Sequence, residues 1–240
     1  MQSSSASQPP RVDLSDATSV VMSMERAQLL SFVLLIPIVA ISLVPHWALW
    51  GVPSGNPFPL WLIALFVVSI VVHEALHGLG YRWGGAASSD VDFGFNWQGM
   101  APYAHCSAAL RANPYRLAIA LPGLVLGGVP LGMGLLLGSW NLTMYAFLML
   151  LAAAGDAILL WMMREISGDR WIQDHPTEMG CLVLGHPSSA EAPVLAVELE
   201  DDTSDKSEDG VAWTTLIYGF LLAALVGAAV GVFGYMIVGS

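Results

Sequence analysis

Two long apolar stretches, each broken once by a short polar or Gly-rich segment, dominate the first two thirds of this chain. Residues 27–73 contain no charged side chain, and residues 117–163 contain a single one. A helix that crosses the hydrocarbon core of a membrane needs about 20 apolar residues. The pattern therefore predicts membrane-spanning helices, which cover residues 28–50, 58–81, 116–138, 142–163 and 212–238.

The polar segments divide the chain around these spans. Residues 1–26 are rich in Ser and Pro and predict a polar, disordered N-terminus, and residues 27–184 hold the first four spans. Residues 185–210 predict an acidic linker, since eight acids and one base fall within 191–209. The remaining residues, 211–240, carry the last span. We therefore expect an all-α membrane protein with about five transmembrane helices.

One loop carries a different periodicity. From Val91 to Gln98, apolar residues alternate with polar residues or Gly, which is the pattern of a β-strand. Gly99 and Pro102 then interrupt the alternation, so the loop after the second span predicts a small β-hairpin-like element. An edge strand there could hold an extended substrate by strand addition. The alternative is a hairpin that only packs against the membrane face.

Composition supports a membrane protein and excludes some partners. Charged residues make up 11% of the chain, against about 25% in soluble globular proteins, and 55% of residues are hydrophobic. A net charge of −11 argues against nucleic acid as a partner. The acid-rich, Lys-poor balance is typical of a halophilic prokaryote, and the two cysteines cannot form a disulfide scaffold.

Basic residues predict the orientation in the cell membrane. They occur before the first span, after the second and after the fourth, whereas loops 51–57 and 139–141 have none. Because Lys and Arg concentrate in cytoplasmic loops, we expect the N-terminus and both long loops to be cytoplasmic.

Apart from Arg116, the first residue of the third predicted span, only two charged side chains lie inside the predicted spans, Glu74 and Asp156. A charge at the centre of a membrane costs on the order of 2.5–3.5 kcal/mol, so each needs a function. Glu74 belongs to the segment His73-Glu74-Ala75-Leu76-His77, an HExxH pattern. Residues i and i+4 share one face of a helix, so His73 and His77 can bind one Zn²⁺, with Glu74 beside the water that it activates.

Asp156 is the predicted third ligand because it lies at the same depth as the two histidines. It precedes Arg164 by eight residues, about 12 Å of helix, and His73 and His77 precede Arg82 by nine and five residues. Both helices run in the same direction.

Two other residues compete for a place in the site. His105, beside Cys106, is an alternative third ligand for zinc. Asp174 precedes His175-Pro176 and is either an additional site residue or, as we favour, a capping or turn-forming aspartate.

Several segments together resemble a known family: HEALHGLGYRWGG, DFGFNWQGMAPYAHC, YRLAIALPGLVLG, AGDAILLWMMR and QDHPTEMGC. In order and spacing, from about residue 58 to 184, they are similar to the putative zincin peptidases. These are small multi-pass membrane proteins related in plan to site-2-type intramembrane metalloproteases. The resemblance implies a zinc peptidase with His73, His77 and Asp156 as metal ligands and Glu74 as general acid/base.

The leading hypothesis is therefore a zinc-dependent intramembrane or membrane-boundary metallopeptidase. Its partners would be the lipid bilayer and a membrane protein or peptide substrate. The alternative is a non-catalytic membrane scaffold or chaperone with a structural or vestigial metal site.

Overall fold

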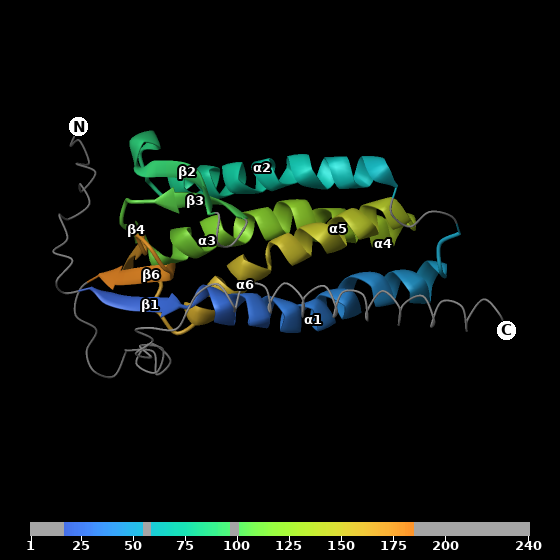
Figure 1. Ribbon diagram of the computed structural model, residues 1–240, viewed down its shortest axis with the longest axis horizontal. Helices are drawn as coiled ribbons and strands as arrows, with labels where there is room; N and C mark the ends of the chain where they lie inside the picture. Colours follow the sequence, from blue (N-terminus) through green and yellow to red (C-terminus); the bar gives the residue numbers. More distant parts are fainter. Residues whose placement is uncertain (1–16, 55–58, 97–100, 185–240) are drawn as a thin grey trace, which may run out of the picture.

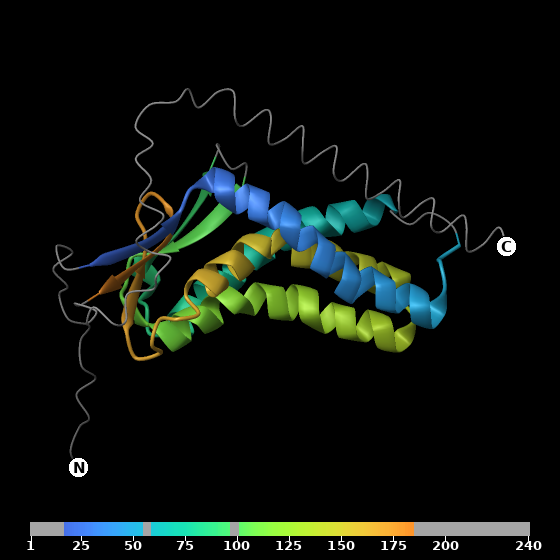
Figure 2. The same ribbon diagram turned by 90° about the horizontal axis from the view of Figure 1, so that it is seen from below.

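The computed structural model describes residues 17–54, 59–96 and 101–184. Its helices lie side by side along the long axis of the molecule, and its strands gather at one end of them (Figure 1, Figure 2). The linker and helix expected at 185–240 fall outside the described residues, as does most of the expected N-terminal segment. The fold that positions the functional residues is therefore a helical bundle capped at one end by small sheets.

The helical segments follow the order of the first four predicted spans, and the third and fourth spans are each divided into more than one helix. They are α1 (Met24–Trp50), α2 (Leu60–Trp83), α3 (Ala112–Pro122), the π-helical η3 (Gly123–Gly128), α4 (Val129–Leu137), α5 (Trp140–Ala152) and α6 (Ala154–Met162). Three described segments are long and apolar enough to cross a membrane, namely α1, α2 and the continuous run 112–137. The pair α5 and α6 makes a fourth if a span bent by 48° is counted as one. Five spans are not confirmed.

Local sequence explains where these helices begin and end. Ser23 caps α1, since its hydroxyl accepts a hydrogen bond from the Arg26 N–H at 3.4 Å. Gly51 and Gly138 follow α1 and α4 with φ angles of 79° and 64°, a left-handed conformation in which glycine has no steric cost. Many large apolar side chains on the outer faces are exposed, among them Ile36, Leu60 and Leu136, as expected where lipid surrounds a protein.

The strands include a four-stranded antiparallel sheet that the hydrophobic pattern does not predict. Its order is β1 (Thr18–Met22), β6 (Met179–Leu184), β5 (Trp171–Asp174) and β4 (Leu110–Arg111). The sequence predicts disorder up to residue 26, yet residues 18–22 pair with β6 over the full length of β1. The prediction was wrong for these residues because β1 is stabilised by a partner near the other end of the described chain, which local patterning cannot reveal. The fold is thus helical with small sheets rather than all-α.

The predicted hairpin is present and lies along α2. It consists of β2 (Val91–Asn96) and β3 (Ala101–Cys106), paired so that Phe93 faces Ala104 and Asp92 faces His105. Its Phe93 ring packs so closely on Gly78 of α2 that a Cβ atom at Gly78 would lie 2.6 Å from the ring. Glycine at this position lets the hairpin reach the helix that carries the HExxH segment.

Candidate metal centre

The structure brings together His73, His77 and Asp156, the three residues that the sequence proposes as ligands. His73 Nε2 lies 3.1 Å from Asp156 Oδ2, and His77 Nε2 lies 3.3 Å from Asp156 Oδ1. One donor atom from each residue falls within 4.8 Å of the other two. Both imidazoles are buried on one face of α2, as their i, i+4 spacing predicts.

A bend between α5 and α6 places Asp156. The sequence predicts one continuous helix over 142–163, but the structure breaks it at Ala153, and α6 starts again at Ala154. Asp156 therefore stands in the first turn of a helix, where unpaired N–H groups and the positive end of the helix dipole favour a carboxylate. The bend thus supplies an electrostatic reason for the aspartate that depth alone does not give.

The orientation of His77 is fixed by the backbone of α3. Its Nδ1 lies 3.0 Å from the Ala118 carbonyl oxygen. Because a carbonyl can only accept, Nδ1 carries the proton that it donates to Ala118, and Nε2, the nitrogen that faces Asp156, is the one that could bind a metal. This is the tautomer that a metal-binding histidine needs, with its second nitrogen hydrogen-bonded to an outer partner.

Two residues that sequence reasoning missed make this hydrogen bond possible. The carbonyl of Ala118 would normally accept from the N–H of residue 122, but residue 122 is proline and has no N–H. The carbonyl is therefore free to accept from His77. Gly80 provides the close approach, since a Cβ atom there would lie 2.5 Å from Ala118 Cα. A proline four residues after a position in a predicted helix is the signal that could have found this carbonyl.

The unpaired atoms of the cluster fit a divalent metal. Among the described residues, His73 Nδ1 and Asp156 Oδ2 are buried and have no hydrogen-bond partner. Asp156 Oδ2 lies 3.1 Å from His73 Nε2, so a carboxylate oxygen and an imidazole nitrogen converge on one point. Ligand atoms about 2.0–2.1 Å from a tetrahedral Zn²⁺ lie roughly 3.3 Å apart, similar to the observed separations. Two imidazoles and one carboxylate are also a donor set that leaves the fourth position open.

Glu74 lies beside this cluster and touches the hairpin. Its carboxylate interacts electrostatically with both histidines and with Asp156, and it accepts a hydrogen bond from the backbone of Ala104 in β3. Glu74 is only partly buried, whereas His73 and His77 are buried. A titratable group therefore adjoins the three candidate ligands on the side where β3 passes.

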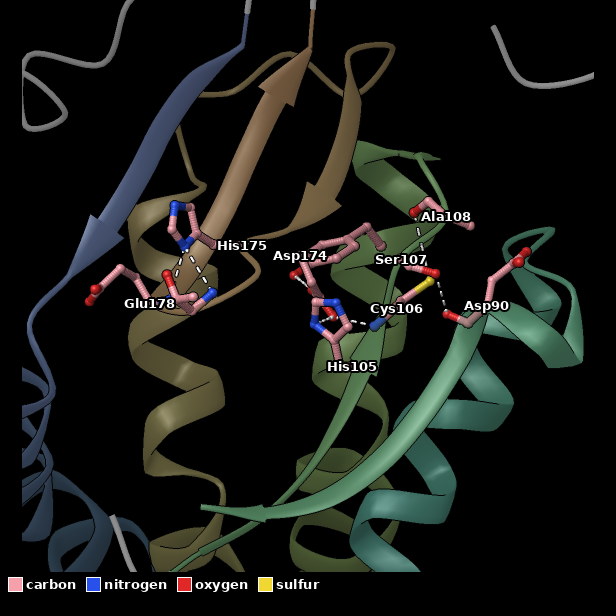
Figure 3. A network of polar contacts seen from close by, with 10 residues as sticks. Asp90, His105, Cys106, Ser107, Ala108, Asp174, His175 and Glu178 are labelled. Carbon is pink, nitrogen blue, oxygen red and sulfur yellow. Dashed lines mark hydrogen bonds and ion pairs between the residues drawn. The ribbon is translucent and has the colours of Figure 1, made fainter. Parts of the chain in front are cut away.

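His105 and Asp174 belong to a second cluster rather than to the group of three ligands (Figure 3). The Asp174 carboxylate is 8% exposed and accepts hydrogen bonds from the Tyr115 hydroxyl and, at 2.6 Å, from the Cys106 N–H. His105 Nδ1 lies 3.7 Å from it. Burial raises the pKa of the Asp174 carboxyl, and the hydrogen bonds from Tyr115 and Cys106 act in the opposite direction.

The expected turn after β5 is present, but Asp174 does not form it. Instead, His175 Nδ1 accepts the N–H of Glu178 at 2.9 Å, and the His175 N–H donates to the Gly180 carbonyl at 3.1 Å. The interpretation of Asp174 as a turn-forming residue was therefore wrong. Its side chain points inward because three elements that are distant in sequence, α2, α3 and β3, supply its hydrogen-bond donors.

The two cysteines are buried, free thiols on β3 and β6. Burial raises the pKa of both Cys106 and Cys181 to about 12, so both are protonated at neutral pH. A protonated, buried thiol is a poor nucleophile and a poor metal ligand. Cys106 contributes its backbone N–H to the Asp174 cluster rather than its sulfur.

Comparison with known proteins agrees with this geometry. A family model described as "Putative zincin peptidase" matches residues 66–167, which include the HExxH segment, the hairpin and Asp156. The match ends before the QDHPTEMGC segment that the sequence resemblance included. No curated protein and no solved structure matches the chain. The resemblance seen in the sequence is confirmed: over residues 66–167, this chain is similar to the putative zincin peptidase family.

Proposed function

We propose that this protein is a zinc-dependent metallopeptidase that cleaves membrane-protein or peptide substrates at the membrane boundary. The observation that carries the proposal is the convergence of His73, His77 and Asp156 next to Glu74. Zn²⁺ held by such residues lowers the pKa of bound water to about 7 and polarises a carbonyl group. The open fourth position of a three-ligand site suits a catalytic centre rather than a structural one.

In this proposal, Glu74 is the general acid/base. Its carboxylate would take a proton from the attacking water and return it to the leaving amine. The hydrogen bond from Ala104 holds the side chain between the candidate ligands and β3. A substrate must be extended to be cut, because a helix hides its carbonyl groups in hydrogen bonds. We propose that such a segment lies beside β3, which passes Glu74, and pairs with it by strand addition.

The same proposal places the centre near the cytoplasmic side. The end of the bundle that carries the strands also carries Arg82, Arg111 and Arg164, whereas loop residues 51–54 and 139 at the opposite end carry no basic side chain. Basic residues concentrate on the cytoplasmic face of membrane proteins. A cytoplasmic N-terminus, with β1 and α1 following it, is consistent with this distribution.

The test compares wild-type protein with Glu74→Gln, which keeps the size of the side chain and removes its basicity. Both proteins, loaded with one equivalent of Zn²⁺ in liposomes, are mixed with solubilised bacterial membrane proteins, and new N-termini are identified by mass spectrometry. We expect equal zinc content and cleavage by the wild type alone. Cleavage by Glu74→Gln would overturn the mechanism. A zinc-loaded wild type that cleaves nothing would instead favour the non-catalytic scaffold.

A further inference from the structure

We infer that Asp174 is a positioning residue of the metal centre, although it lies outside both the ligand cluster and the segment matched by the family model. The inference rests on the proposed function, since it assigns Asp174 a role in orienting His77 and Glu74. Two chains of contacts lead from its carboxylate, one to each of these residues.

The Asp174 carboxylate joins four separate elements. It accepts hydrogen bonds from the hydroxyls of Tyr115 on α3 and Tyr81 on α2, and from the N–H of Cys106 on β3. Asp174 itself is the last residue of β5. Tyr81 and Tyr115 are both buried, so their hydroxyls depend on this acceptor. The sheet is thereby attached to both helices that contact each other at the metal centre.

The first chain of contacts reaches a candidate ligand through Tyr81. The Tyr81 and His77 rings lie one helical turn apart, with centroids separated by 6.4 Å and planes inclined by only 25°. The Tyr115 ring also packs against Tyr81, with centroids 5.8 Å apart. While the Ala118 carbonyl fixes the Nδ1 end of His77, the Tyr81 ring restricts rotation of the imidazole plane. Asp174 holds Tyr81 in that position.

The second chain reaches Glu74 through the backbone of β3. The N–H groups of Ala104 and Cys106 are two residues apart, so they point to the same edge of the strand. Ala104 donates to Glu74, and Cys106 donates to Asp174. The hydrogen bond from Cys106 to Asp174 therefore fixes where β3 lies along the axis of α2. It thereby also fixes the position of the Ala104 amide that binds Glu74.

Asparagine is the sharpest replacement for Asp174 because it has nearly the same shape. An Asp174→Asn variant turns one acceptor oxygen into a donor, so at least one of the three donors loses its partner. Tyr81→Phe removes only the hydroxyl of the first chain. Asp169→Asn is the matched control, since Asp169 is an exposed aspartate in the turn just before β5.

The experiment measures zinc affinity by competition with a chromogenic chelator, together with the absorption spectrum of the Co²⁺-loaded protein, for the full chain in detergent. We expect Asp174→Asn to weaken zinc binding about 10-fold, as changes of outer-shell partners do, and to alter the Co²⁺ bands. The Asp174→Asn/Tyr81→Phe double variant should bind zinc no more weakly than Asp174→Asn, because both changes break the same chain of contacts, the one that runs through Tyr81. Asp169→Asn should match the wild type.

Each other outcome counts against a stated claim. Additive losses in the double variant would show that Asp174 does not act through Tyr81 and would overturn the first chain of contacts, whereas an unchanged affinity and spectrum in Asp174→Asn would overturn the inference. If Asp174→Asn does not fold, Tyr81→Phe alone decides: weaker zinc binding supports the first chain and unchanged binding overturns it. Wild-type protein that binds no zinc would overturn the proposed function, whereas zinc-binding wild type with an unaffected Asp174→Asn overturns this inference alone.

Hydrogen exchange of backbone amides distinguishes the second chain of contacts, through β3, from the first, through Tyr81. Asp174→Asn should speed hydrogen exchange in a peptide that covers residues 101–106, whereas Tyr81→Phe should not. Equal exchange in wild type and Asp174→Asn would overturn the role assigned to β3.

Discussion

Asp156 and Asp174 are two inward-facing aspartates that meet the same face of α2, at His73 and His77 and at Tyr81 respectively, and their surroundings are opposite in kind. Asp174 receives hydrogen bonds from two hydroxyls and one backbone N–H. Asp156 faces the Nε2 atoms of two imidazoles, and its Oδ2 has no hydrogen-bond partner among the described residues. The first carboxylate is held by hydroxyl and amide donors, whereas the second faces two imidazole nitrogens, a donor set that suits a divalent metal.

The difference teaches how to separate a ligand from a structural carboxylate in an apolar protein. Burying a charge without partners is costly, so a carboxylate filled by donors holds segments of the chain together. A carboxylate that faces two imidazole nitrogens instead forms a set of metal-binding groups. His77 shows the same logic, since its proton is committed to Ala118 and its free nitrogen faces Asp156.

The largest expected effect comes from removing the Asp156 carboxylate, which faces the two imidazoles. Asp156→Ala should abolish stoichiometric zinc, because two imidazoles alone leave half of the coordination to water. Zinc per chain is measured on the purified protein by elemental analysis. Asp174→Asn, examined beside it, should still bind one zinc, though more weakly. Full zinc retention by Asp156→Ala would show that Asp156 is not a required ligand, and would favour His105 as the third ligand.

A smaller effect is expected from restoring the helical hydrogen bond that Pro122 removes. Pro122→Ala supplies an N–H for the Ala118 carbonyl, which then competes with His77 Nδ1 for this acceptor. We expect zinc affinity to fall about 10-fold, the cost of disturbing an outer-shell partner, without loss of thermal stability in the zinc-free protein.

The matched control for that change is Pro130→Ala, which removes a different proline of the continuous run 112–137. It leaves the Ala118 carbonyl as it is, so zinc affinity should stay at the wild-type value. Equal losses in both variants would show that helix flexibility, rather than the freed carbonyl, governs binding.

Sequence reasoning finds the three candidate ligands because their signals are local. The i, i+4 spacing fixes the relation of His73 to His77, and a lone charge in an apolar span singles out Asp156. The hairpin is also visible in its own alternation. Each of these inferences needs no knowledge of how distant parts of the chain pack.

The remainder depends on contacts between distant segments. Strand β1 forms because β6 lies beside it, and the inward position of Asp174 depends on donors from α2, α3 and β3. The bend at Ala153 has no proline or glycine at its position to announce it. Pro122 marks a free carbonyl in the sequence, but the choice of His77 as its donor requires the close packing of α2 on α3 through Gly80.

The smallest expected effect tests the histidine of the second cluster. His105 Nδ1 lies 3.7 Å from Asp174, which keeps its closer donors, Tyr115 and Cys106, when His105 is replaced. His105→Ala should therefore keep one zinc per chain, with a change in affinity well below the roughly 10-fold that outer-shell changes cause. Elemental analysis and chelator competition measure both quantities. Loss of zinc in His105→Ala would show that His105 belongs to the metal site, and would contradict the distinction between Asp156 as a ligand and Asp174 as a structural carboxylate.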